Sequence, residues 1–208
     1  MLLRRAASHI RGLSSVILHT PPSHAPRESP TPLVFVSSSS WDEGSLKGTP
    51  SIPTRLALKG FTSLQIDLQI PEASMKNSVT MMTEYEDELF SRIRSSSIPF
   101  PPVIFSREAT CLIAQTYISS NPASGLVLIS PPINNAELIG TKLPTNLAEF
   151  DYEPKFPIAV IDTPERVADL LKRNRICQSG MVDVIPVDQL NEEETFSQIV
   201  QWLDKLGI

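Results

Sequence analysis

Short apolar runs alternate with segments of helical periodicity along most of the chain, and this alternation limits the folds open to it. Segments with apolar residues spaced three and four apart, such as residues 80–95 and 107–120, separate the runs. The pattern predicts an α/β protein with a mostly parallel sheet of about six strands, flanked by helices. The six strand-like runs are residues 33–36, 61–68, 103–105, 126–129, 158–161 and 182–185.

The composition is that of a soluble, globular protein with one domain of ordinary size. The chain has 208 residues, of which 41% are hydrophobic and 20% are charged. Its apolar runs are too short for a transmembrane segment. The two cysteines, Cys111 and Cys177, have no C-x-x-C spacing and no neighbouring histidine, so we predict no metal site and no cofactor. Cys111 is expected in the core, and a disulfide between the two stays open.

The N-terminal segment differs from the rest of the chain. Residues 1–27 contain four arginines, several serines and no acidic residue. A basic, Ser-rich segment with interspersed apolar residues is typical of a mitochondrial transit peptide. The stretch Arg11-Gly12-Leu13-Ser14 also resembles a matrix-peptidase cleavage site. The alternative is a basic tail without a targeting role.

These features divide the chain into three parts. We predict a transit peptide at residues 1–27, a linker at 28–31 and a folded domain at 32–208, located in the mitochondrial matrix. Residues 28–208 hold 14 of the 18 Lys and Arg residues and all 23 Asp and Glu residues, a net charge of −9. An acidic domain disfavours binding to nucleic acid and to anionic lipid.

Residues 106–110, with the sequence Ser-Arg-Glu-Ala-Thr, join the third strand-like run to a helical segment. A strand, a short elbow and a helix resemble the G-x-S-x-G nucleophile elbow of α/β-hydrolases. The order of the runs, and the Ser-rich loop at residues 37–40, are similar to that superfamily from its third strand onward. The resemblance covers residues 32–208 and implies a core that lacks the first strands. The alternative, a Rossmann or flavodoxin-like fold, has no G-x-G-x-x-G to support it.

The resemblance also implies where a catalytic triad would lie. The nucleophile position falls on Glu108, and the acid position on Asp162 or Glu165. The histidine would fall near residues 187–190, which read Val-Asp-Gln-Leu, and all three histidines of the chain precede residue 25. Because the nucleophile needs a base to activate it, we predict a degenerate member of the superfamily, a pseudoenzyme.

The elbow itself has an alternative structural interpretation. Ser106 can cap the following helix, and Glu108 can lie in its first turn, where the helix dipole favours a carboxylate. This interpretation predicts an ordinary helix start in place of a strained elbow. We expect a ligand cleft formed by Ser37, Ser38, Ser106, Arg107 and Glu108.

Two functions follow from these observations. The first is a non-catalytic mitochondrial interaction or assembly module with an unidentified protein partner, contacted through residues 133–155 and the mouth over Glu108. The second is a divergent hydrolase or small-ligand binder that uses the cleft around Glu108. A serine nucleophile, Ser106 or Ser130, would have only Lys142 or Lys155 as its base.

Overall fold

A seven-stranded sheet forms the centre of the protein in the computed structural model, which describes residues 14–96 and 98–208. The strand order is β1-β3-β2-β4-β5-β6-β7, with β1 antiparallel to β3 and every other neighbouring pair parallel. The predicted mostly parallel sheet is confirmed, and all six predicted runs are strands. The strands are β1 (Ser15–His19), β2 (Ser29–Ser37), β3 (Phe61–Asp67), β4 (Val103–Arg107), β5 (Gly125–Ile129), β6 (Ile158–Asp162) and β7 (Asp183–Pro186).

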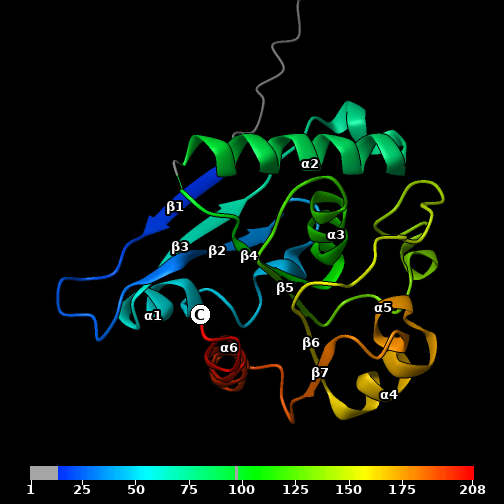
Figure 1. Ribbon diagram of the computed structural model, residues 1–208. Coiled ribbons are helices and arrows are strands. Elements are labelled where there is room, and N and C mark those ends of the chain that lie inside the picture. The colour runs from blue at the N-terminus through cyan, green and yellow to red at the C-terminus, as the bar shows by residue number, and fades with distance from the viewer. Residues whose placement is uncertain (1–13, 97) are drawn as a thin grey trace, which may run out of the picture.

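Helices cover both faces of this sheet, with α2 and α3 on one side and α1 and α6 on the other (Figure 1). None of the helices in the described part of the chain is long and apolar enough to cross a membrane. The α-helices are α1 (Ile52–Leu58), α2 (Ser78–Ser95), α3 (Cys111–Ser120), α4 (Pro164–Arg173), α5 (Arg175–Gln178) and α6 (Glu192–Leu206). Short 3-10 helices are η1 (Glu43–Leu46), η2 (Glu72–Lys76), η3 (Glu108–Thr110) and η4 (Asn135–Leu138).

The central strands are buried on both faces, which explains their continuous apolar sequences. Along β4, Ile104 packs on the α2 and α3 side, whereas Val103 and Phe105 pack on the α1 and α6 side. The Phe105 ring stacks on Phe35 of β2, with centroids 4.4 Å apart. Complete burial of such a side chain contributes about 1.5–3 kcal/mol to the stability of the fold. The packing on both faces therefore fixes the position of β4 and of the elbow that follows it.

The fold begins earlier than residue 32, the predicted boundary. Strand β1 pairs with β3 from Ser15 opposite Asp67 to His19 opposite Ser63. Ser14 anchors its start, because its hydroxyl accepts a hydrogen bond from the Gln69 N–H at 3.0 Å. The predicted transit peptide therefore overlaps a strand of the sheet, and its first 13 residues lie outside the described ones. A five-residue strand next to a basic segment has too weak a pattern to be separated from a targeting sequence.

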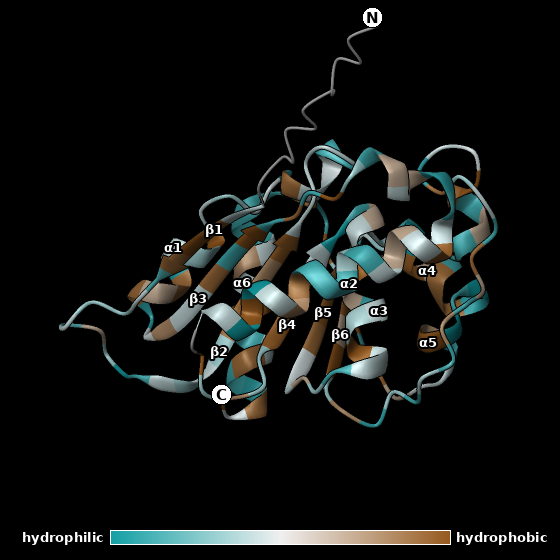
Figure 2. Cartoon of the chain, turned by 90° about the horizontal axis from the view of Figure 1, so that it is seen from above, coloured by the Kyte–Doolittle hydropathy of each residue, from teal (hydrophilic) through white to brown (hydrophobic). Residues whose placement is uncertain are grey.

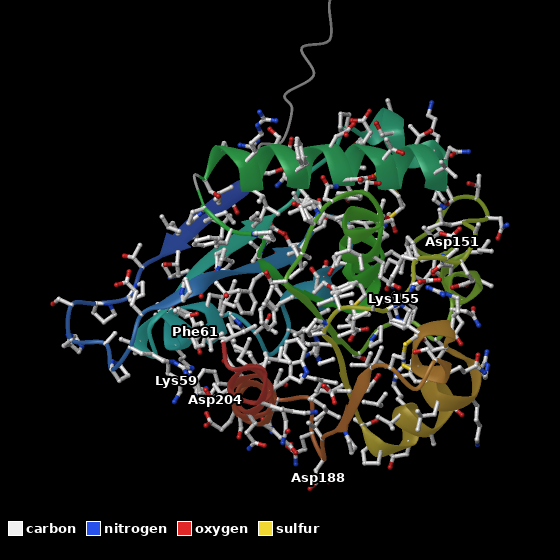
Figure 3. All side chains as sticks on the ribbon, viewed as in Figure 1. Lys59, Phe61, Asp151, Lys155, Asp188 and Asp204 are labelled. Atoms are coloured by element: carbon white, nitrogen blue, oxygen red, sulfur yellow. The ribbon has the colours of Figure 1, made fainter. Side chains whose placement is uncertain are left out.

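The predicted linker at residues 28–31 is also part of the sheet, since β2 starts at Ser29. Arg27, just before it, lies over the Phe61 ring at 4.9 Å and forms an ion pair with Asp204 of α6 at 2.9 Å. Figure 3 labels Phe61, which packs on the α1 and α6 side of the sheet, and Asp204 on α6. The connection between β1 and β2 is therefore tied to the domain at its second end.

Candidate functional site

The elbow between β4 and α3 keeps a strained backbone. Glu108, at the nucleophile position, has a φ of +54°, in the left-handed region that side chains other than glycine rarely adopt. Ser106 is inside β4, opposite Val36 and Leu128, so it does not cap the helix. The predicted ordinary helix start is wrong, and the elbow conformation is retained.

Thr110 occupies a position where the G-x-S-x-G pattern has glycine. Its buried hydroxyl donates to the Arg107 carbonyl at 2.6 Å and accepts from the Arg107 N–H at 3.3 Å. These two bonds close the turn across Glu108. A larger residue is therefore tolerated here because it satisfies backbone groups that the turn would otherwise leave unpaired.

A carboxylate accepts a hydrogen bond from the backbone N–H next to the nucleophile position. In α/β-hydrolases, the N–H of the residue after the nucleophile contributes to the oxyanion hole. Here that N–H belongs to Ala109, and it donates to Asp42 Oδ2 at 2.9 Å. The Asp42 side chain is buried, and its Oδ1 accepts from the Gly44 N–H at 3.2 Å. The donor that would stabilise an oxyanion is thus bound to a negative charge of the protein itself.

Lys142 holds Asp42 in this position. Its Nζ lies 3.1 Å from Asp42 Oδ1 and donates to the Trp41 carbonyl at 3.0 Å. The Trp41 indole N–H donates in return to the Lys142 carbonyl at 2.9 Å. Residues 133–155, which include Lys142, are therefore fastened to the loop that follows β2. No motif in the sequence points to Asp42; its only signal is its place in the loop after the second predicted strand.

Glu108 is a half-exposed acid beside a buried arginine. Arg107 Nε lies 3.9 Å from Glu108 Oε1, and its Nη1 donates to the Leu190 carbonyl at 3.4 Å. Burial raises the pKa of Glu108, and the Arg107 charge opposes that rise. A carboxylate with this environment can accept a proton, but none of the described residues that line its cleft is a histidine that could activate water.

The predicted acid position, Asp162, is filled by an acid with a different partner. Asp162 is fully buried at the end of β6, and Arg166 Nε donates to its Oδ2 at 2.9 Å. The N–H of Val187 donates to the Asp162 carbonyl at 2.9 Å, so the stretch where a histidine was expected does lie beside this acid. The Asp162 carboxylate is therefore paired with an arginine from the helix that follows β6. The other candidate, Glu165, is exposed on α4.

His19, Lys142 and Lys155 do not replace the missing catalytic histidine as a base. His19 belongs to the predicted transit peptide but is in β1, where it lies opposite Ser63, near the amino ends of the parallel strands and away from the elbow. Lys155 pairs with Glu153 and is exposed. In the described residues, neither Lys142 nor Lys155 forms a hydrogen bond with Ser106 or Ser130, so the predicted Ser–Lys pair does not form.

The structure does not bring the five residues of the predicted ligand cleft together in one place. Ser37, Ser106 and Arg107 line a separate cavity of about 20 Å³, room for about one water molecule. The Ser38 hydroxyl is buried, donates to the Leu68 carbonyl at 2.9 Å and bonds to the Tyr85 hydroxyl. Only Glu108 of the predicted five faces an open cleft of about 450 Å³. That cleft is lined by Ser40, Trp41, Asp42, Glu43, Gly44, Lys47, Glu108 and Lys142.

Both cysteines are free and buried, so the two do not form a disulfide. Burial raises the pKa of the Cys111 thiol to about 12 and that of Cys177 to about 11. Both thiols are therefore protonated at neutral pH and are poor nucleophiles. Across residues 14–96 and 98–208, no three side chains of the His, Cys, Asp and Glu types come together as a metal site.

Comparison with known proteins gives a clear answer at the level of the fold. No protein-family model matches the chain, and no curated protein matches it. Apo esterase 2 of Thermogutta terrifontis is 14% identical, with a TM-score of 0.58 over 93% of this chain and 90% of the esterase. A protein of unknown function from Staphylococcus aureus is 8% identical, with a TM-score of 0.61 over 94% of this chain and 95% of its own.

The same esterase in its native form gives a TM-score of 0.59 at 13% identity, over 93% of this chain and 88% of the esterase. The match spans most of the length of both chains. At such low identities the likeness concerns the backbone arrangement alone. The chain has the α/β-hydrolase-like fold of these esterases.

Proposed function

We propose that this protein is a non-hydrolytic member of the α/β-hydrolase-like fold that serves as an interaction or assembly module. The observation that carries the proposal is the 2.9 Å hydrogen bond from the Ala109 N–H to Asp42. An acyl-transfer site needs this donor free for the charge that develops on the substrate oxygen. A buried carboxylate at the same place repels such a charge.

Each of the three acids around the elbow lies beside a lysine or an arginine, whereas the acid of a catalytic triad lies beside a histidine. Asp42 lies beside Lys142 at 3.1 Å, Glu108 beside Arg107 at 3.9 Å and Asp162 beside Arg166 at 2.9 Å. An arginine does not release its proton near neutral pH, so neither Arg107 nor Arg166 can act as a general base. These pairs stabilise the loops at the carboxyl ends of the strands. None of them is the acid–histidine–nucleophile arrangement that relays a proton in a hydrolase.

A second candidate, a binder of small polar ligands, is favoured by the open cleft over Glu108. Its lining carries both signs of charge, with two lysines, Lys47 and Lys142, and three acids, Asp42, Glu43 and Glu108. Strained residues are also concentrated at ligand sites, and Glu108 is one of them. Such a ligand would be small and zwitterionic, and binding would stabilise the fold in thermal-shift measurements.

The test of the proposal is a search for turnover. The protein is incubated with a fluorophosphonate probe and with a panel of aryl esters and thioesters, beside the variants Glu108→Gln and Glu165→Gln. We expect no labelling and rates equal to those of buffer for all three proteins. Hydrolysis that disappears in Glu108→Gln but persists in Glu165→Gln, the exposed control, would overturn the proposal.

We also propose that the protein is mitochondrial and that cleavage occurs after Leu13. The sequence motif supports cleavage before Ser14, and the structure makes that position preferable to residue 27. Removal of residues 1–27 would delete β1, whereas removal of residues 1–13 leaves it whole. N-terminal sequencing of the protein from isolated mitochondria should therefore start at Ser14. A full-length protein confined to the cytosol would contradict the location.

A further inference from the structure

The two edges of the sheet are built differently. Strand β7 at one edge holds Asp183, which accepts from the Trp202 indole N–H at 2.9 Å and from Lys205 Nζ at 2.7 Å. It ends at Pro186, which has no N–H to offer a neighbouring strand. Charges, proline and helical cover are the devices that prevent a sheet edge from pairing with another chain.

Strand β1 at the other edge is less protected in the described part of the chain. It contains no charged residue and no proline, and its other side has no strand partner in the described part of the chain. Val16, Ile17 and Leu18 are consecutive and 40%, 50% and 50% exposed. Figure 2 shows hydrophobic residues on β1 at this end of the sheet.

The apolar surface continues from β1 onto α1. Thr54 of α1 lies against β1, with its hydroxyl 3.3 Å from His19 Nδ1. Leu58 is one helical turn further along the same side of α1 and is 57% exposed. Ile17 is on the same side of the sheet as His19, because side chains alternate along a strand. Ile17 and Leu58 therefore extend one surface at this edge.

The sequence of β1 is complementary to itself. In an antiparallel pair centred on a twofold axis at Ile17, Val16 lies opposite Leu18 of the second copy, and the two Ile17 residues face each other. No like charges are placed opposite one another. This matters because residues 14–208 hold 15 Lys and Arg residues against 23 Asp and Glu residues, a net charge of −8. Two such acidic molecules approach most readily through a charge-free strand.

We propose that a second copy of this chain adds its β1 to β1 in antiparallel orientation, so that two sheets join into one across a twofold axis. Backbone hydrogen bonds of the two free edges provide the pairing, and the apolar side chains of β1 and Leu58 are buried by it. This inference does not depend on the absence of hydrolysis: the dimer forms whether or not the cleft over Glu108 binds or transforms a ligand.

Sedimentation velocity of the full chain, from low to high micromolar concentration, tests the proposal. We expect a concentration-dependent dimer for the natural sequence and for Met181→Lys, a control at a residue that is 56% exposed far from β1 in the sequence. Ile17→Lys should raise the dimer dissociation constant by about tenfold or more, because two lysines would face each other across the axis.

A cross-linking experiment keeps the proposal testable if Ile17→Lys folds poorly. Opposite Cβ atoms of an antiparallel pair lie about 4.5–5.5 Å apart, close to what a disulfide needs. Ile17→Cys should form a covalent dimer on mild oxidation, whereas Val79→Cys, 57% exposed on α2, should not. A natural chain that is monomeric throughout, or equal cross-linking of the two cysteine variants, overturns the proposal.

Discussion

Glu108 directly follows β4 and Asp162 ends β6, and the resemblance seen in the sequence implies a catalytic position for each of these acids. The structure separates them. Asp162 is fully buried, and its side chain is bound to Arg166 and to the Thr163 N–H at 2.8 Å. Glu108 is 41% exposed, has a cation only at 3.9 Å, and has a left-handed backbone.

The difference shows that the two acids at this end of the sheet have opposite environments. The Asp162 carboxylate is part of a tight ion pair with Arg166. Glu108 has a strained backbone and a side chain without a close partner. Strain of this kind costs about 1–3 kcal/mol and persists only where the surrounding structure imposes it. At Glu108 the surroundings are Thr110, Asp42 and the buried strand β4.

The largest effect is expected at Asp162. Asp162→Ala removes the partner of Arg166 and the acceptor of the Thr163 N–H, and leaves a small cavity. We expect a loss of about 2–4 kcal/mol in the free energy of unfolding, less than for a pair buried on both sides because Arg166 reaches solvent. Urea unfolding measures this, with Asp169→Ala as the control, since Asp169 is an exposed acid on α4, the helix of Arg166. A loss as small as that of the control would mean that Asp162 stabilises the fold no more than an exposed acid does.

Asp42 should come next. Asp42→Ala leaves the Ala109 N–H without its acceptor, which costs about 1–3 kcal/mol. Asp42→Asn keeps an oxygen for that N–H and should lose less. The difference between the two variants in urea unfolding isolates the hydrogen bond from the packing. Equal losses would mean that the bond to Ala109 contributes little.

A smaller change of opposite sign is expected at the elbow backbone. Glu108→Gly relieves the left-handed strain but increases the freedom of the unfolded chain, so a net gain of up to about 1 kcal/mol is expected. Ser130→Gly is the matched variant, because Ser130 at the end of β5 also has a positive φ, of +49°. A clear loss of stability in Glu108→Gly alone would show that its side chain, and not its backbone, stabilises the elbow.

The smallest effect concerns the charge of Glu108. Because its pKa is raised in the folded state, its ionised form is disfavoured by folding, and this penalty is present above its folded pKa. As pH falls below the pKa of the unfolded chain, both states are protonated and the penalty disappears. Glu108→Gln should therefore raise the melting temperature slightly near pH 7 and leave it unchanged near pH 3. A variant that is less stable near pH 7 would indicate that the Arg107 charge outweighs burial.

Individual strands show which parts of the fold can be predicted from the sequence. Strands β4, β5 and β6 are predictable because burial on both faces makes them continuously apolar. Strand β1 is not, because an exposed edge strand needs no such pattern and its partner β3 is more than 40 residues away. For residues 133–155, the predicted contact surface, the sequence does not tell which apolar side chains are exposed. Leu143 is buried, and Leu138, Leu147, Phe150 and Tyr152 pack against the core, which leaves Ile139 exposed.

The sequence alone determined the fold class and the missing histidine, because strand periodicity and residue types are local properties. It also located the elbow, through a strand and a helix joined by five residues. Only the tertiary structure decided that Glu108 keeps the left-handed conformation and that Asp42 fills the donor at Ala109. The second of these is a contact between residues 67 positions apart in the chain. Such a contact is set by how β2 and β4 lie side by side in the sheet, and no local pattern encodes it.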